Sequence, residues 1–310
     1  AYPDGQLNPD AYPVMGLTFG IAMALAIFLS ALGTHSSIPR LPVPAEVERF
    51  SAARLMGEMR EALSNDSFRN FFFGLLVFYI ARGVDGALSI YMATFFWRLE
   101  TSDVLLLPAV GLIGIVVGTP AWSWAAQRID KRSVFMIGLV WFSVLVTLLP
   151  PLQILGIYFP RESPFYVNTI YLVTLLAAIG AAGPILAAGS MLADIADEHE
   201  VETHRRQEGI FFGAFSFSGK AAVGLGSSIA GAALTLIAFP TQVDPSQVPH
   251  EIVMMLGIVA GPGVAGLMVV GIVLMGRYRL TRDRLEAIQA ELAARREAGE
   301  VPGSGPVISE

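Results

Sequence analysis

The sequence predicts an all-α integral membrane protein with seven membrane-spanning helices. Hydrophobic residues make up 54% of the chain and charged residues only 15%, whereas a soluble domain carries about 25% charged residues. The apolar residues gather into seven runs, and each run is long enough to cross a bilayer as a helix of about 20 residues. The few charges inside these runs are costly at the bilayer centre, so they mark candidate functional positions.

Short polar or charged segments separate the seven apolar runs. The first run is too long for the apolar core of a signal peptide and lacks the basic residues that precede such a core. We therefore expect it to span the membrane like the other six. The predicted spans are residues 13–33, 70–97, 104–127, 133–158, 165–193, 209–239 and 251–276.

The basic residues predict how the chain is oriented. Seven spans place alternate loops on the same side, and one side receives 16 of the 20 Lys and Arg residues. Loops rich in Lys and Arg remain in the cytoplasm. We therefore expect a multi-pass protein of the plasma membrane with its C-terminus in the cytoplasm and its N-terminus outside.

The spans divide the chain into four regions. Residues 45–63 and 281–298 have the apolar spacing of amphipathic helices. The chain opens without a Met, in what resembles an external loop, so we expect it to be the later part of a longer protein. The regions are an external loop and span (1–33), a cytoplasmic loop (34–69), a six-span bundle (70–280), and a cytoplasmic helix with a disordered tail (281–310).

Lys220 is a charge near the middle of the sixth span. It lies about 16 Å along the helix from Gly209, at 1.5 Å per residue, and Ser216 and Gly224 share its face. A small, polar stripe of this kind suits a cavity better than lipid. We predict that Lys220 and Ser216 contact the substrate or the coupling site; the alternative is a structural lysine neutralised by a nearby carboxylate.

Arg82 and Asp85 are two further charges inside a span. They are three residues apart, so they can pair on one helix face. The alternative is that Asp85 pairs with Lys220 across the bundle, since the two positions have similar depths. A local pair would only hold the helix, whereas the pair with Lys220 would join the charges in one site. We predict that Arg82 and Asp85 belong to the substrate or coupling site, with Tyr79 as a further candidate facing the cavity.

Residues 190–220 carry the most specific motif. A small residue and two aspartates end the fifth span, a charged hairpin follows over 194–208, and the next span carries a lysine. These positions resemble the glycoside–pentoside–hexuronide:cation symporter family of the major facilitator superfamily, although His204 replaces a glycine. The matching residues are Ala193, Asp194, Asp197, Thr203, Arg205, Arg206, Glu208, Gly209 and Lys220.

The resemblance implies a fold and a mechanism. The chain would hold the sixth span, the central loop and the C-terminal six-helix bundle of a twelve-span transporter. Such a protein couples the uptake of a sugar or glycoside to Na⁺ or H⁺ by alternating access. The missing N-terminal bundle of the same protein would be the partner of this chain and would hold most of the cation site.

The charges at the end of the fifth span have an expected role in gating. By resemblance, they would form salt bridges that break and re-form between the two states of the transporter. The alternative is a solvated loop that only sets the orientation. The predicted gate residues are Asp194, Asp197, Arg205, Arg206 and Glu208.

Other functions find little support in the sequence. The chain has no cysteine, and His199 and His204 lack the spacing of a zinc protease motif. We therefore expect no enzyme, no metal site, no cofactor apart from the coupling cation, and no nucleic-acid partner. A carrier for another substrate class, such as a lipid or a drug, and a non-transporting membrane sensor or scaffold remain as alternatives.

Overall fold

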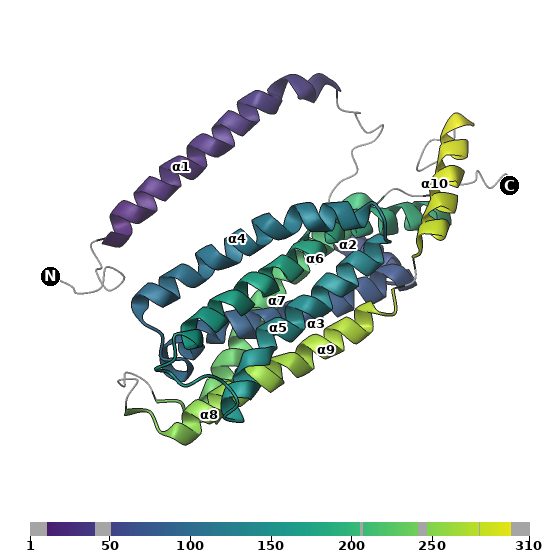
Figure 1. Cartoon of the computed structure of the whole chain (residues 1–310). Coiled ribbons are helices and arrows are strands. Elements are labelled where there is room, and N and C mark those ends of the chain that lie inside the picture. Colours follow the sequence, from purple (N-terminus) through teal and green to yellow (C-terminus); the bar gives the residue numbers. More distant parts are fainter. Residues whose placement is uncertain (1–10, 41–50, 205–206, 241–246, 279, 299–310) are drawn as a thin grey trace. The chain divides into compact units, whose positions relative to one another are not determined.

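The computed structural model describes residues 11–40, 51–204, 207–240, 247–278 and 280–298. Every element of regular structure in these ranges is helical (Figure 1). Seven of these helical segments are long and apolar enough to cross a membrane. The predicted fold class and the predicted number of spans are therefore confirmed.

The chain divides into two compact units, and the first ends at Ser51. It holds the spanning helix α1 (Ala11–Thr34) and the 3-10 segment η2 (His35–Arg40). The large apolar side chains of α1 are exposed on all sides of the helix. An all-round apolar surface is typical of a span surrounded by lipid or by other spans.

The second unit, Ala52–Glu310, holds the other six spans. We call the end of this unit that carries α10 the α10 end, and the opposite end, where η3 lies, the η3 end. Its elements are α2 (Ala52–Ala62), α3 (Asp66–Tyr91), η3 (Met92–Phe96), α4 (Thr101–Ala126), α5 (Lys131–Ile154), α6 (Phe165–Thr203), α7 (Glu208–Leu236), α8 (His250–Ile258), η5 (Val259–Gly263), α9 (Val264–Met275) and α10 (Arg282–Glu297).

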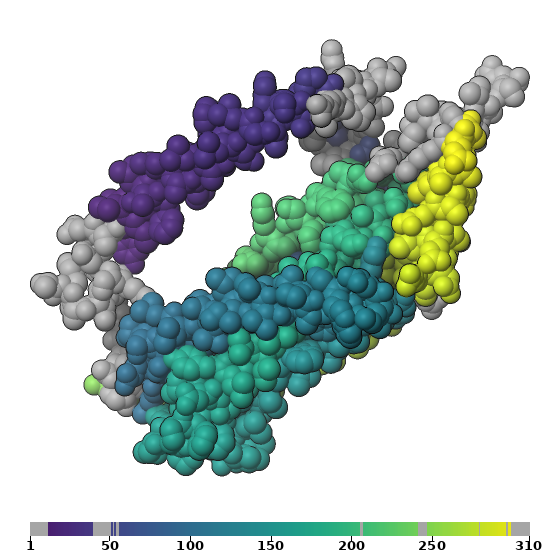
Figure 2. Space-filling model, turned by 45° about the horizontal axis from the view of Figure 1, so that its top comes forward, coloured from purple at the N-terminus to yellow at the C-terminus, as the bar shows by residue number. Residues whose placement is uncertain are grey.

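Two helix groups form the bundle: α6 packs against α4 and α5, and α3 packs against α7 and α9. Glycines let α4 approach α6 closely. A Cβ atom on Gly114 would lie 2.6 Å from the carbonyl oxygen of Leu175, and one on Gly118 would lie 2.8 Å from that of Ile179. The outer face of α4 remains on the surface of this unit (Figure 2).

The start of α3 lies a few residues before the predicted span. Asn65 provides the N-cap, because its side-chain oxygen accepts a hydrogen bond of 2.8 Å from the Phe68 backbone N–H. This bond satisfies one of the donors that every helix leaves unpaired at its first turn. The structure thus joins a polar first turn to the apolar run that begins near residue 70.

Helix α6 corrects the hairpin that the sequence predicts over 194–208. The helix continues to Thr203, and the turn comes at His204, which adopts a left-handed conformation with φ of 57°. Helix α6 has 39 residues, and at 1.5 Å per residue its length is greater than the thickness of a hydrocarbon core, which is roughly 30 Å. The charged residues after Asp194 therefore extend the helix beyond the apolar layer.

Two short helices lie near this extension. Helix α10 packs on α6, and its side chains Ile288 and Leu292 are buried. Arg295 of α10 donates to the Val201 carbonyl oxygen of α6 at 3.3 Å. Helix α2 lies within the amphipathic segment expected over 45–63. Residues 1–10, 41–50 and 299–310, which include the expected tail, lie outside the described residues.

Candidate functional site

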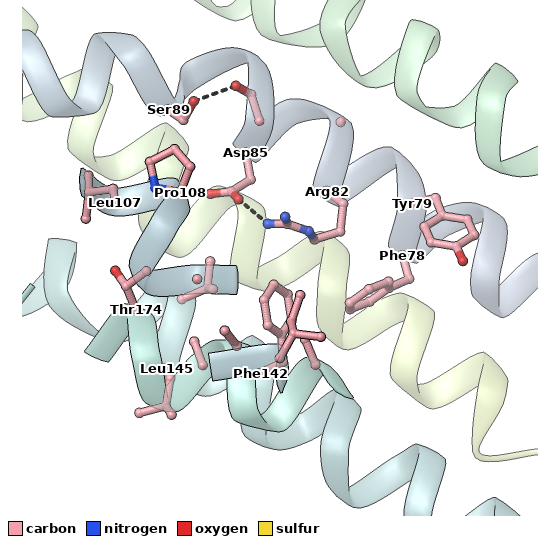
Figure 3. Close-up of a pocket in the computed structure, with 18 of the residues that line it drawn as sticks. Phe78, Tyr79, Arg82, Asp85, Ser89, Leu107, Pro108, Phe142, Leu145 and Thr174 are labelled. Atoms are coloured by element: carbon pink, nitrogen blue, oxygen red, sulfur yellow. Dashed lines mark hydrogen bonds and ion pairs between the residues drawn. The ribbon is translucent and has the colours of Figure 1, made fainter. Parts of the chain in front are cut away.

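The second unit contains a cavity of about 1420 Å³ between its spans. Helices α3, α4, α5, α6 and α7 supply most of its wall (Figure 3). The lining runs from Gly189 of α6, toward the α10 end, to Trp97, which follows η3. The cavity therefore extends along much of the length of the bundle.

Arg82 and Asp85 are the charged residues among the described side chains of this wall. They lie three residues apart on α3, and the Arg82 guanidinium donates a hydrogen bond to the Asp85 carboxylate (Figure 3). Each side chain keeps part of its surface open, with 38% of Arg82 and 26% of Asp85 exposed. The pair is therefore accessible from the cavity.

An aromatic ring holds Arg82 from a second direction. The guanidinium carbon lies 4.8 Å from the centre of the Phe142 ring on α5, within the range of a cation–π interaction. Phe142 also contacts Phe78 of α3, with ring centres 6.2 Å apart. Arg82 is thus oriented by Asp85 along its own helix and by Phe142 across the bundle.

The rest of the wall is mostly apolar. Two of its hydroxyl groups donate to carbonyl oxygens of their own helices, Ser89 to Gly86 and Ser227 to Val223. These serines offer a ligand fewer free donors. Tyr79 and Thr174 add polar atoms to the wall, and the labelled side chains around the pair are chiefly aliphatic or aromatic (Figure 3).

The structure does not bring Lys220 to the ion pair. Lys220 and Ser216 lie on an exposed face of α7 and are not among the residues that line the cavity, whereas Val223 and Ser227 of the same helix are. Asp85 pairs with Arg82. Of the two alternatives for Asp85, the structure has the local pair on α3 and not the pair across the bundle.

A second ion pair connects α5 and α6 at the α10 end. The Lys131 ammonium lies 2.9 and 2.8 Å from the two carboxylate oxygens of Asp194, whose side chain is 9% exposed. Burial and the negative charges of Asp194 and Glu198 raise the pKa of the nearby Tyr278. Tyr278 therefore stays a neutral hydroxyl beside this pair.

The other predicted gate residues do not join that pair in the part of the chain that the structure describes. Asp197 and Glu208 are half-buried near the α6–α7 turn, where each has interactions of its own. Arg205 and Arg206 lie outside the described residues. The structure thus adds Lys131, from the start of α5, as the partner of Asp194.

Phe142 and Lys131 are site residues that the sequence analysis did not select. Phe142 stands in an unbroken apolar run and gave no signal of its own. Lys131 belongs to a basic segment that helps to predict the orientation of the chain, and it lies 63 residues from the aspartate that it contacts. Among the described residues, no three His, Asp or Glu side chains gather as metal ligands.

Known proteins resemble the chain over most of its length. An uncharacterized symporter of Synechocystis sp. is 23% identical over 292 residues, which are 92% of this chain and 50% of the relative. A sodium-dependent lysophosphatidylcholine symporter of Danio rerio is 24% identical over 221 residues, 70% of this chain and 38% of the relative. A sphingosine-1-phosphate transporter of Xenopus tropicalis is 23% identical over 176 residues, which are 56% of this chain and 31% of the relative.

The chain spans about half the length, or less, of these curated relatives. The model of one protein family, described as MFS/sugar transport protein, matches residues 2–282. This match confirms the resemblance that residues 190–220 carry. The chain belongs to the MFS/sugar transport protein family, which is the melibiose permease-like family of the major facilitator superfamily.

Proposed function

We propose that the full protein is a cation-coupled symporter of an amphipathic, charged organic solute, and that Arg82 and Asp85 bind its polar group. The proposal rests on one observation: an accessible ion pair lies in the wall of a large, apolar cavity between spanning helices. Charged groups inside a membrane span are costly and usually mark a substrate or ion pathway.

The chemistry of the wall favours an amphiphile. A sugar is bound through many hydrogen bonds, because each hydroxyl that loses water must find a partner. The described wall offers one ion pair and few other polar side chains. An acyl chain instead gains free energy from apolar surroundings, at about 0.8 kcal/mol per buried CH₂ group.

The ion pair suits a polar group that carries charge. Arg82 presents guanidinium donors that match a phosphate or carboxylate, and Asp85 presents an anion that attracts an ammonium group. Two of the relatives carry such molecules according to their names, lysophosphatidylcholine and sphingosine-1-phosphate. The volume of about 1420 Å³ exceeds the 300–1,000 Å³ of ordinary small-ligand pockets, so a long chain has room.

A sugar or glycoside is the second candidate. The description of the matching family favours it, and the missing N-terminal bundle would supply further polar side chains around the same space. In this case Arg82 and Asp85 would bind sugar hydroxyls through charge-assisted hydrogen bonds.

Coupling to a cation completes the proposal. Lys220 lies exposed on α7, within a spanning helix, where a bare ammonium facing lipid would be costly. We expect the N-terminal bundle to cover this face and to supply the carboxylates that hold Na⁺ or H⁺. Lys220 would then link the cation site to the cavity. Movement of both bundles around this site would alternate the access.

Uptake by the reconstituted full-length protein tests the proposal. Proteoliposomes would be offered lysophosphatidylcholine or a glycoside, with an inward gradient of Na⁺ or of H⁺. We expect gradient-driven uptake of the lipid and none of the glycoside. Uptake of the glycoside and not of the lipid would show that the substrate is a sugar and not an amphiphile. No uptake of either, by protein shown to be folded, would favour a sensor or scaffold.

A further inference from the structure

The last turn of the first span in the second unit is π-helical. In η3, the backbone N–H of Trp97 donates to the carbonyl oxygen of Met92 at 2.8 Å, and that of Leu99 donates to Ala93 at 2.9 Å. These bonds reach five and six residues back, whereas an α-helix reaches four. A π turn thus holds one residue more than an α turn, and such turns occur frequently at functional sites.

Arg98, which follows this turn, has an unusual backbone conformation. Its φ is 50°, in the left-handed region that residues with a side chain rarely adopt. The wide turn and the positive φ lie next to each other in the chain. Local strain of this kind gathers at ligand clamps and switch regions, where surrounding contacts hold it in place.

The strained segment forms the wall of the cavity at the η3 end. Met92, Ala93 and Trp97 line the cavity, and Trp97 is only 7% exposed. The Trp97 ring packs edge-on against Tyr158, at 5.4 Å between ring centres, and against Tyr166, at 6.2 Å. Trp97 therefore stands in the cavity wall where α3 ends, packed against two tyrosine rings.

Contacts from three other parts of the second unit hold the segment in this position. The hydroxyl of Tyr166 donates to the Trp97 carbonyl oxygen at 3.2 Å, and the Arg161 guanidinium donates to that of Phe96 at 3.4 Å. Phe96 fills the space beside Gly257 of α8, where a Cβ atom would lie 2.2 Å from the ring. These contacts come from the α5–α6 connection, from α6 and from the last span.

The helices around the segment are themselves irregular. Gly261 lies in the π turn η5 of the last span, and a Cβ atom there would lie 2.8 Å from Pro150 of α5. Pro262 and Pro150 lack the N–H that a regular helix uses. Ala260 and Pro150 also line the cavity. The wall at the η3 end is therefore built from helix segments that lack the full set of helical hydrogen bonds.

We propose that η3 is a gate whose π and α registers correspond to a closed and an open η3 end of the cavity. In the π register, Trp97 stands in the wall. Conversion of this turn to the α register would shift the residues after it by one helical position, which is about 100° around the axis and 1.5 Å along it. Trp97 would leave the wall, and its carbonyl would lose the Tyr166 hydroxyl. The use of the gate in transport rests on the proposed function.

A cysteine reporter makes the gate measurable without a substrate. This chain has no cysteine, so Gly111→Cys adds the one thiol of this region to a full-length protein whose other cysteines are replaced. Gly111 lines the cavity on α4, and a Cβ atom there meets open space. The rate of labelling by a membrane-impermeant maleimide, added at the η3 face, reports access.

Tyr166→Phe is the central variant. It removes the donor to Trp97 but keeps the ring, and we expect labelling to rise about five-fold, the population shift that one ordinary hydrogen bond supplies. Tyr171→Phe is the matched control, because Tyr171 lies on the same helix and its hydroxyl donates to Asp103 of α4 at 2.7 Å and not to the segment of η3 and Trp97. Labelling in this control should equal that of the parent.

Deletion of Thr94 tests the register itself. Thr94 lies within η3 and does not line the cavity, and removal of one residue restores the α register. Met92 and Trp97 then become four residues apart, so Trp97 keeps its place in the wall within an α turn. We expect slow labelling that no longer responds to Tyr166→Phe, because the second register is no longer available. If this variant does not fold, the comparison of Tyr166→Phe with Tyr171→Phe is sufficient to test the gate.

Equal labelling of the parent, Tyr166→Phe and Tyr171→Phe would overturn the gate. A folded Thr94 deletion in which Tyr166→Phe still raises the labelling rate would also overturn it. The labelling result is independent of the proposed function. If labelling responds as expected but the protein takes up neither lipid nor glycoside, the gate is supported and the proposed symporter function is rejected.

Discussion

Asp85 pairs with Arg82 of its own helix and not with Lys220 of α7. The pair neutralises its charges within one turn of α3, so the isolated bundle has no need of a distant partner for either group. Lys220 instead lies on an exposed face. The ion pair in the cavity wall and the face around Lys220 are therefore two separate polar features of the bundle, and each leads to its own prediction.

Removal of one charge from the pair should destabilise the protein more than removal of both. Asp85→Asn leaves the Arg82 guanidinium without its carboxylate, and the loss of a charged hydrogen bond typically costs about 1.5–3 kcal/mol. Arg82→Leu together with Asp85→Leu leaves no charge in this wall and should unfold near the wild-type temperature. Thermal unfolding of detergent-solubilised protein measures both. A double variant less stable than Asp85→Asn would contradict the account.

Lys220→Ala should abolish uptake by the full-length protein without removing it from the membrane. The ammonium has no carboxylate partner among the described residues of this chain, so we expect its role to lie in coupling and not in the packing of α7. Leu225→Ala, an exposed position on the same helix, is the matched control and should retain uptake. Uptake at the wild-type rate by Lys220→Ala would show that Lys220 has no role in substrate binding or coupling.

Breaking the pair between Lys131 and Asp194 should weaken the α10 end of the bundle. Asp194 is largely buried, whereas 39% of Lys131 is exposed, so solvent screens part of the interaction. Lys131→Met should lower the unfolding temperature, because it leaves the buried carboxylate unpaired. The exchange of Lys131→Asp with Asp194→Lys should recover part of the loss. If Lys131→Met matches the wild type, the pair contributes nothing to stability.

Close packing of α4 on α6 gives a prediction about two glycines of one helix. Gly118→Ala places a methyl group 2.8 Å from a backbone carbonyl oxygen of α6, and overpacking of this kind costs about 1–3 kcal/mol. Gly111→Ala meets open space and should leave the unfolding temperature unchanged. Equal stability of the two variants would show that α4 and α6 lie further apart than the structure has them.

The sequence predicts the features that depend on local order. Apolar runs follow from the thickness of the bilayer, so all seven spans were found. The pair of Arg82 and Asp85 follows from their spacing on one helix, although the sequence alone left the pairing with Lys220 open. The family could be recognised because residues 190–220 carry a dense motif.

The features that depend on distant contacts could not be read in this way. Lys131 meets Asp194 across 63 residues, and Phe142 reaches Arg82 from another helix. Hydropathy ends the fifth span near residue 193, but the backbone hydrogen bonds of α6 continue to Thr203, because charged residues also form helices. The π turn η3 likewise packs against a distant part of the chain, with the Phe96 ring beside Gly257 of α8.

Direct binding of lysophosphatidylcholine to the purified full-length protein tests the central claim, that Arg82 and Asp85 hold the polar group of an amphiphile. The measurement compares the wild type with the folded double variant Arg82→Leu, Asp85→Leu. We predict saturable binding to the wild type and affinity at least about tenfold lower in the variant, which corresponds to a loss of about 1.4 kcal/mol. Equal affinity of the two proteins would contradict the account.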